Sequence, residues 1–271
     1  MPLRIYQSYF KDEQISLMDK EFYLLDNREN FQSELREHPL NLRCYQQSVK
    51  DNIDLWGLVS WKWRNKVHDI SASQLIKIIE SNPGYDIYFV NPYPNIDSIW
   101  YNTWEHGEHC HPHIIEICQE LFPAIGLDSN LLFQPTAYDI SCWGNYYVGN
   151  KKFWDAWLDL IGRYLLKLPM LSERVQKIHR SSAQYPDDSS VGYFPFIHER
   201  LFSTFLVNYQ NTFKIKSIPC GLNVLSSVDA HLRNIKFQAL QTRDTQLLLE
   251  WDQLRGSPNS EITQKIRNLW K

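Results

Sequence analysis

The densest group of potential ligands in the chain is a histidine-rich stretch. Residues 104–113 read W-E-H-G-E-H-C-H-P-H. Imidazole and carboxylate groups are ordinary zinc ligands, so residues 106–113 could serve a metal-dependent hydrolase. The spacing does not match H-E-x-x-H, and an expected helix break between Gly107 and His111 separates the histidines. A helix junction with capping histidines and a substrate-contacting loop are the other interpretations.

A second group combines cations with indole rings. Residues 61–66 read W-K-W-R-N-K and directly follow the apolar run 55–60. Lys62 and Arg64 could hold a phosphate or a diphosphate while an indole stacks on a base or a sugar. A solvated, charged face with one anchoring tryptophan is the alternative.

The third candidate is a carboxylate set among apolar residues. Residues 195–202 read P-F-I-H-E-R-L-F. On a helix, Glu199 shares a side with Phe196 and Phe202. Burial there would raise the pKa of Glu199 towards the range that a general base uses. A salt bridge between Glu199 and an arginine is the alternative.

A short apolar strand is expected to end beside a candidate ligand-binding residue. Ile87 to Val90 form a buried-strand pattern between Asn82-Pro83-Gly84 and Pro92. The strand therefore ends at Asn91, and in open α/β sheets ligands bind at the carboxyl ends of strands. A core strand followed by a proline-rich turn is the alternative.

The remaining elements alternate between strand and helix patterns, which favours an α/β fold. Ser71 and Gln74 form a capping box at the start of the helix 72–81. Together with the strands 55–60 and 86–91 this helix predicts a right-handed, parallel βαβ unit. The other expected strands are 3–10, 22–25, 138–148 and 213–218, and the other expected helices are 97–104, one opened by His111-Pro112, 152–166, 196–207 and those beyond 228. The segment 34–45 is ambiguous, because Pro39 breaks any helix there.

Bulk properties are those of a soluble globular protein. The chain has 271 residues, a formal net charge of -3 and 43% hydrophobic residues. This charge argues against a nucleic-acid partner. Five cysteines without a C-x-x-C pair fit a reduced compartment. No apolar run is long enough to cross a bilayer, and the N-terminus does not read as a signal peptide. We therefore expect a cytoplasmic protein.

The order of these patches resembles a known family. The chain carries a D-N-x-x-N loop from Asp26, W-G-L-V-S-W-K-W-R at 56–64, N-Y-Y-V-G-N-K-K-F-W at 145–154 and F-I-H-E-R-L-F-S-T-F-L at 196–206. These segments look like the small GT-A-like glycosyltransferases of bacterial capsule and O-antigen clusters. The resemblance covers roughly residues 3–220 and rests mainly on the order and spacing of its motifs.

The resemblance implies a GT-A-like, Rossmann-type sheet, mostly parallel and flanked by helices. It divides the chain into a transferase domain at 1–220 and a C-terminal helical appendage at 221–271. The implied activity is hexosyltransferase-like. A sugar passes from a nucleotide-sugar donor, with UDP favoured, to a saccharide or lipid-linked acceptor in surface polysaccharide biosynthesis. Peripheral membrane association would suit a lipid-linked acceptor. A non-catalytic carbohydrate-binding module is the alternative.

The resemblance also implies roles for individual residues. Glu199 would deprotonate the acceptor hydroxyl. Asp26 and Asn27 would lie near the base or ribose of the donor, Asn91 near the sugar-phosphate, and Lys62 and Arg64 near the diphosphate. The acceptor side is assigned to four further residues, which are Glu105, His111, Asn145 and Tyr146.

The family's metal motif is missing from this sequence. Such folds place an Asp-x-Asp motif, which holds a divalent metal such as manganese or magnesium, where this chain reads Asn91-Pro92-Tyr93. Three interpretations follow. Cations such as Lys62 or Arg64 offset the diphosphate charge without a metal, or Asp97 or Glu105 holds the metal instead, or the transferase is degenerate and inactive.

Overall fold

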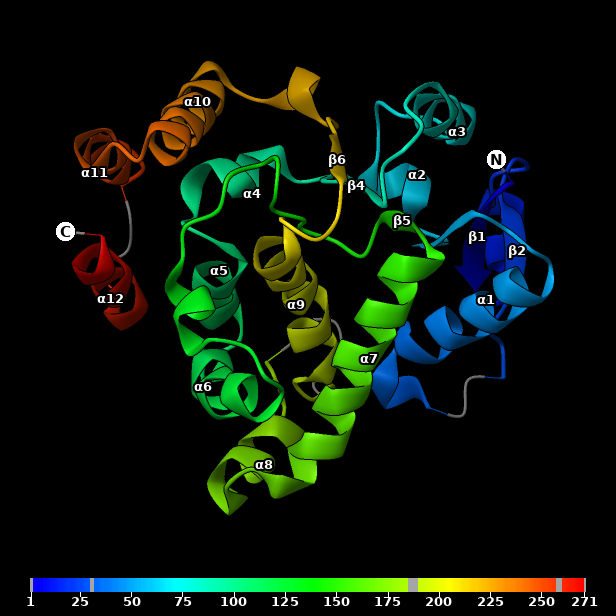
Figure 1. Cartoon of the computed structure of the whole chain (residues 1–271), viewed down its shortest axis with the longest axis horizontal. Helices are drawn as coiled ribbons and strands as arrows, with labels where there is room; N and C mark the ends of the chain where they lie inside the picture. The colour runs from blue at the N-terminus through cyan, green and yellow to red at the C-terminus, as the bar shows by residue number, and fades with distance from the viewer. Residues whose placement is uncertain (1, 30–31, 185–189, 257–259, 271) are drawn as a thin grey trace.

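The computed structural model describes residues 2–29, 32–184, 190–256 and 260–270. Over these residues the chain forms a mixed six-stranded sheet with helices on both faces (Figure 1). The strands are β1 (Leu3–Tyr9), β2 (Tyr23–Asp26), β3 (Leu55–Ser60), β4 (Ile87–Val90), β5 (Tyr147–Asn150) and β6 (Ile215–Ile218). The predicted α/β class, with a mostly parallel sheet flanked by helices, is confirmed.

Helices account for most of the remaining described chain. The α-helices are α1 (His38–Lys50), α2 (Trp63–Lys66), α3 (Ala72–Ser81), α4 (Pro94–Ile99), α5 (Thr103–Cys110), α6 (Ile114–Ala124), α7 (Lys151–Lys167), α8 (Glu173–Arg180), α9 (Phe194–Tyr209), α10 (Ser227–Thr242), α11 (Thr245–Leu254) and α12 (Glu261–Leu269). Short 3-10 helices are η1 (Asp12–Leu17), η2 (Ser33–Leu35), η3 (Ser129–Phe133), η4 (Leu168–Met170) and η5 (Leu222–Val224).

The strand order is β2-β1-β3-β5-β4-β6. All neighbouring pairs are parallel except those of β5, which lies antiparallel between β3 and β4. The predicted unit β3-α3-β4 therefore consists of parallel strands, but these strands are not hydrogen-bonded neighbours. Gly57 of β3 allows β5 to approach, because a Cβ there would lie 2.4 Å from the carbonyl oxygen of Tyr147.

Several local expectations differ from the structure. Pro39 does not break a helix. It lies in the first turn of α1, where a missing N–H costs nothing. His111-Pro112 does not open α6, because His111 is the C-cap of α5 and α6 begins at Ile114. The expected strand 138–148 is reduced to β5, while the capping box of Ser71 and Gln74 at α3 is confirmed.

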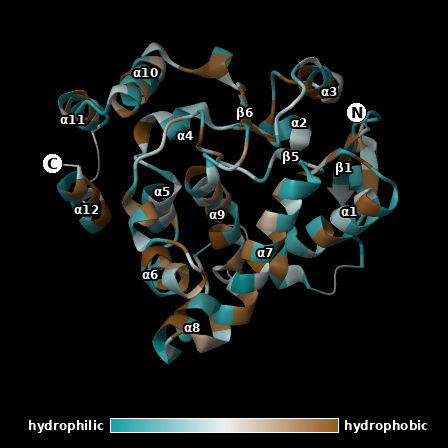
Figure 2. Ribbon diagram, viewed as in Figure 1, coloured by the Kyte–Doolittle hydropathy of each residue, from teal (hydrophilic) through white to brown (hydrophobic). Residues whose placement is uncertain are grey.

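The sheet separates two hydrophobic cores. Alternate strand residues such as Trp56, Leu58 and Phe89 face the larger core, which α1, α7 and α9 complete. The residues between them, such as Val59 and Tyr88, face a smaller core under α2 and α3. Burial on both faces explains why β3 and β4 read as continuous apolar runs. Figure 2 shows the mixed polar and apolar surfaces of helices such as α8 and α12, which cover the outside.

Helices α10, α11 and α12 gather at the end of the molecule opposite β1 and β2, with α10 packed against α4 (Figure 1). Their boundary with the rest of the chain at residue 220 stays a prediction. None of the helices in the described residues has the length and apolar character needed to cross a membrane.

Candidate functional site

A cleft of about 580 Å³ lies at the carboxyl edge of the parallel strands. Its walls come from the ends of β1, β3 and β4, from the approach to β5, from the start of α1, and from α9. Ligands of open α/β sheets bind at such an edge. The lining residues are Phe10, Arg36, Glu37, Asn41, Leu58, Val59, Ser60, Trp61, Lys62, Lys66, Tyr93, His111, Asn145, Tyr146, Val191, Pro195, Phe196, Glu199 and Arg200.

Five of the predicted site residues meet in this cleft although they come from distant parts of the sequence. They are Lys62, His111, Asn145, Tyr146 and Glu199. Among the lining residues, cations outnumber carboxylates. The cations are Arg36, Lys62, Lys66 and Arg200, and the carboxylates are Glu37 and Glu199. This charge balance favours an anionic ligand.

The sheet-edge wall joins lysines to aromatic rings. The Lys66 ammonium lies 5.9 Å from the ring centres of both Tyr93 and Tyr146. Burial opposes its charge, but Tyr146, Glu199 and Tyr93 outweigh that effect and raise the pKa of Lys66. At the mouth, Lys62 lies over the Trp61 ring, at 5.4 Å from its centre. Lys66 is therefore a half-buried cation within the wall, whereas Lys62 is exposed.

Tyr146 and Asn145 close the wall beside β5. The hydroxyl of Tyr146 is 3.1 Å from Ser60 Oγ, and burial raises the pKa of Tyr146 to about 12, so the phenol stays protonated at neutral pH. Asn145 Oδ1 is buried and has no hydrogen-bond partner within the described residues. Because buried polar atoms are normally paired, this oxygen is suited to accept a hydrogen bond from a ligand.

Two carboxylates belong to the same cleft. Glu199 lies on α9 and Glu37 is the N-cap of α1. Their sequence neighbours His38 and His198 hold the two elements together, with ring centres 6.2 Å apart. Burial raises the pKa of Glu37 against a backbone hydrogen bond, and the charge of Glu199 raises it further. Glu199 itself is only partly buried, so the burial that sequence reasoning expected for it is incomplete.

His111 adds a neutral imidazole to the α9 side. Its ring stacks on Phe196 at 3.8 Å, and burial lowers the pKa of His111 to about 4. His111 Nδ1 is 2.7 Å from the carbonyl oxygen of Ala183, so the neutral ring carries its proton on that nitrogen. Nε2 is then an acceptor that a substrate hydroxyl could use.

Arg200 is the most deeply buried cation of the cleft, with 7% of its surface exposed. Its Nε donates to the carbonyl oxygen of Thr103 at 3.0 Å, and its Nη1 donates to that of Phe196 at 3.0 Å. His106 Nδ1 lies 3.5 Å from Nη2. Burial lowers the pKa of Arg200, against the attraction of Glu199.

Three other predicted donor residues stand at the same sheet edge without lining the cleft. Asp26 is bound to Arg28, with Nε 3.0 Å from Oδ1, and the backbone N–H of Asn27 donates to Tyr9. The Arg28 guanidinium holds the pKa of Asp26 well below its usual range. Asn30, the last residue of that loop motif, falls outside the described residues. Arg64 turns away to Asp19, 2.7 Å from its Oδ1.

Asn91 is buried beside the cleft rather than in it. Its Oδ1 accepts the backbone N–H of Tyr93 at 3.1 Å, and its Nδ2 has no partner within the described residues. The side chain therefore shapes the turn after β4. Tyr93, two residues further on, is the part of this turn that lines the cleft.

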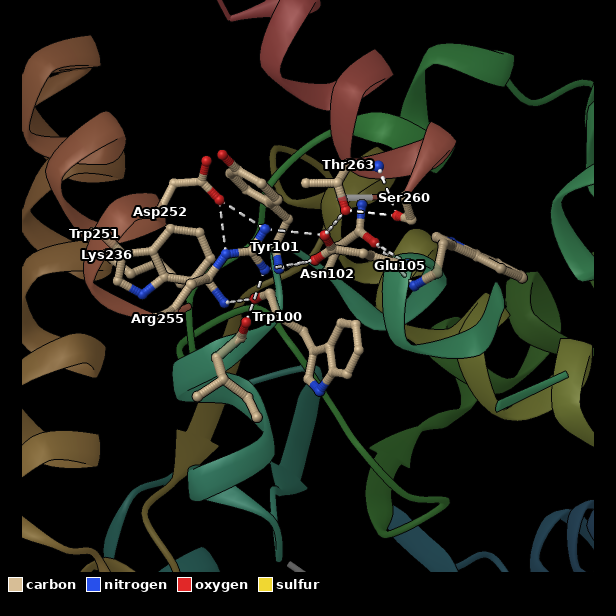
Figure 3. A network of polar contacts seen from close by, with 12 residues as sticks. Trp100, Tyr101, Asn102, Glu105, Lys236, Trp251, Asp252, Arg255, Ser260 and Thr263 are labelled. Carbon is tan, nitrogen blue, oxygen red and sulfur yellow. Dashed lines mark hydrogen bonds and ion pairs between the residues drawn. The ribbon is translucent and has the colours of Figure 1, made fainter. Parts of the chain in front are cut away.

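Glu105 lies in a buried network of ion pairs (Figure 3), Asp97 lies in a second buried pair, and neither residue lines the cleft. Glu105 accepts two hydrogen bonds from Arg255, at 2.9 and 3.0 Å. Asp97 lies 3.6 Å from Lys236 Nζ and accepts from the Trp143 indole at 3.0 Å. Both carboxylates are engaged with protein cations, so they do not fit the metal that the resemblance implies.

The histidine-rich stretch does not form a metal centre either. Across the described ranges, no group of three or more His, Cys, Asp or Glu side chains is arranged to hold a metal ion. His106 and His109 instead pack on the Trp100 ring, at 5.3 and 5.2 Å. The helix-junction interpretation accounts for most of this stretch, and nothing in its geometry supports a metal-dependent hydrolase.

Sequence reasoning missed Glu37, Arg36 and Arg200 as cleft residues. Glu37 precedes the helix-opening His38-Pro39, a signal that marks a helix start when proline is taken as a first-turn residue. Arg36 has a backbone φ of 47°, which non-glycine residues seldom adopt. No pattern in the sequence predicts this conformation. Arg200 was not singled out, because on a helix it diverges from the side that Glu199 shares with Phe196 and Phe202.

Comparisons with known proteins yield a single weak structural similarity. No protein-family model matches the chain, and no curated protein matches it. Among solved structures the chain is similar to an apo structure of WbbM, a bifunctional glycosyltransferase, with a TM-score of 0.49 and 16% sequence identity. The similarity covers 81% of this chain and 45% of that one, so this chain spans less than half of the WbbM chain.

Proposed function

We propose that the cleft transfers a sugar from a nucleotide-sugar donor to a saccharide or lipid-linked acceptor. The observation that carries the proposal is the meeting of Lys62, Asn145, Tyr146, His111 and Glu199 in one cation-rich cleft at the carboxyl edge of the sheet. Their types suit the three tasks of a transferase, with a cation for the diphosphate, polar groups for the acceptor and a carboxylate for the hydroxyl proton. Their convergence is what a transferase site requires.

The donor occupies the sheet-edge wall. Phe10 and Trp61 offer aromatic faces at the mouth, with ring centres 6.2 Å apart, on which a base can stack. Lys62 and Lys66 follow on the same wall and attract the two phosphates. They stabilise the negative charge that develops on the diphosphate as the bond from its oxygen to the anomeric carbon breaks.

The acceptor approaches from the α9 side. Its hydroxyl oxygen attacks the anomeric carbon, the diphosphate leaves with the electron pair, and Glu199 takes the hydroxyl proton. Glu199 is suited to this role because it is partly exposed in the cleft and makes no salt bridge among the described residues. His111 Nε2 and Asn145 Oδ1 supply neutral acceptors that orient other hydroxyls.

Finer details belong to the same proposal. We favour a UDP-sugar donor, a hexosyl group, and a place in surface polysaccharide biosynthesis, with peripheral membrane association for a lipid-linked acceptor. These follow from the family resemblance of the motifs at 56–64, 145–154 and 196–206. The donor phosphates are assigned to lysines, so no step passes through a metal ion.

Ligand binding and turnover test the proposal separately. A nucleoside diphosphate should raise the melting temperature, because a ligand that binds only the folded state stabilises it. Glu199→Gln should abolish sugar transfer while it keeps that thermal shift. The absence of any shift with UDP, GDP or CDP, with and without manganese, would refute the donor site. A non-catalytic carbohydrate-binding module would bind sugars but show no turnover in the unmodified protein.

A further inference from the structure

Arg200 keeps a positive charge in a buried position without a carboxylate in contact. All its hydrogen-bond contacts are to neutral groups, which are the carbonyl oxygens of Thr103 and Phe196 and the ring of His106. No ion pair of Arg200 occurs within the described residues, although Glu199 attracts it from a longer distance. Removing a cation from water without a counter-ion is costly, so proteins usually pair such groups or use them to bind an anion.

The position of Arg200 makes it available to a ligand. It lines the cleft on α9, next to the proposed base Glu199. The proposed donor phosphates lie on another wall, with Lys62 and Lys66 in the segment that follows β3. An anion held by Arg200 therefore approaches Glu199 from the acceptor side.

Gly107 makes room for the guanidinium. A Cβ at position 107 would lie 2.4 Å from Arg200 Nε and 2.8 Å from its Cδ. Gly107 lies within α5, where glycine lowers helix stability relative to alanine. The chain thus keeps a poor helix former at the one place where a methyl group would displace Arg200.

We infer that Arg200 binds an oxyanion, a carboxylate or a phosphate, carried by the acceptor. This inference rests on the proposed function, because it takes the acceptor side from the role of Glu199. A guanidinium offers planar N–H donors that match both kinds of oxyanion. The acceptor class is then an acidic saccharide or a sugar phosphate, and a neutral saccharide is a poor substrate.

Three sugars that share the D-gluco ring and differ in the group at C6 test the inference. Isothermal titration is carried out with D-glucuronate, D-glucose 6-phosphate and neutral D-glucose, with and without saturating UDP. At least one charged sugar should bind, glucose should bind at least tenfold more weakly, and UDP should leave the charged sugar's affinity within about threefold. Binding of glucuronate identifies a carboxylate as the oxyanion, and binding of glucose 6-phosphate identifies a phosphate.

Two variants connect this binding to Arg200. Arg200→Gln removes the positive charge. Gly107→Ala keeps Arg200, but the added methyl group should displace its guanidinium, and alanine is the better helix former within α5. Each should weaken the charged sugar at least tenfold. Arg174→Gln, which changes an exposed arginine paired with Glu116, is the matched control and should have no effect.

The outcomes that overturn the inference are distinct from those that overturn the proposed function. Equal affinity in Arg200→Gln and the unmodified protein, or binding of neither charged sugar, would refute the role of Arg200. Loss of charged-sugar binding in the presence of UDP would refute the acceptor assignment. Failure of nucleoside diphosphates to bind refutes the donor site instead, and the titrations without UDP still decide whether Arg200 holds an oxyanion.

Discussion

Two buried arginines in this molecule have opposite surroundings. Arg255, near the C-terminus, donates to both oxygens of Glu105 and also to Asp252, at 2.8 Å (Figure 3). Arg200, in the cleft, meets only neutral groups at hydrogen-bond distance. Both side chains are shielded from water, so the difference lies in the counter-charge.

This difference indicates that Arg255 has a structural role, whereas we infer that Arg200 binds a ligand. The Arg255 network closes on itself, because Thr263 Oγ1 also donates to Glu105 and Arg267 to Asp252, at 2.7 and 2.6 Å. It joins α5 to the C-terminal helices α11 and α12. Arg200 joins no elements by ion pairs within the described part of the chain, and we infer that its charge serves a ligand that enters the cleft.

The largest expected effect comes from breaking the Arg255 network. Arg255→Met leaves the buried carboxylate of Glu105 without its cation and Asp252 with Arg267 alone, so we expect the free energy of unfolding to fall by about 3–5 kcal/mol. Urea denaturation at neutral pH measures it. A loss below about 1 kcal/mol would mean that this network does not hold the C-terminal helices in place.

Two cations of the segment 61–66 show the same contrast between a cation that lines the cleft and one that is paired with a carboxylate. Lys62 lines the cleft, whereas Arg64 is paired with Asp19. Lys62→Gln should weaken nucleoside diphosphate binding about tenfold, or ~1.4 kcal/mol. Arg64→Gln should leave it unchanged, and titration calorimetry at low salt compares the two. An equal loss in both variants would point to a general effect of charge rather than a contact.

Local patterns predicted the elements that carry this contrast. The strand 55–60 and the helix 72–81 were predicted with their observed boundaries, and the strand predicted at 86–91 is one residue shorter at each end. Buried strands and capping boxes can be recognised because their signals lie in consecutive residues. The insertion of β5 between β3 and β4 was missed. Strand order depends on contacts between distant segments, and the Gly57 contact that permits it has no local signature.

The ion-pair partners of the charged residues were harder to predict than the helices and strands that carry them. Glu105 and Asp97 looked available for a ligand, because their partners Arg255 and Lys236 follow more than a hundred residues later. The sequence also left open a salt bridge between Glu199 and an arginine. Glu199 forms no ion pair within the described residues, and the adjacent Arg200 donates to the carbonyl groups of Thr103 and Phe196 instead.

A smaller effect is expected when Arg200 is replaced. Arg200→Met leaves no contacting carboxylate without a cation. The carbonyl groups of Thr103 and Phe196 lose the arginine as a donor, but they can still accept hydrogen bonds from backbone N–H groups within α5 and α9. We expect the free energy of unfolding to change by less than about 1 kcal/mol, in either direction. Urea denaturation beside Arg255→Met makes the comparison direct. A loss as large as that of Arg255→Met would make Arg200 a structural residue.

The smallest expected effect is on the titration of His106, which reports the Arg200 charge. Burial first, and the Arg200 charge second, lower the pKa of His106 to about 3. Arg200→Met should therefore raise this pKa only partly towards its ordinary value near 6.5, because burial remains. NMR titration of labelled histidines measures the shift, and Arg255→Met should not change it.

The same titration has a consequence for stability. As the pH falls from about 6.5 towards 3, the unfolded chain takes up a proton at His106 before the folded protein does, so this group's contribution to stability is lost over that range. A folded-state pKa above 3 shortens this range at its acid end, so Arg200→Met should lose less stability between pH 5 and pH 3 than the unmodified protein. Urea denaturation at the two pH values measures the loss. An unchanged loss together with an unchanged His106 pKa would mean that the Arg200 charge is already neutralised in solution, which would remove the contrast with Arg255.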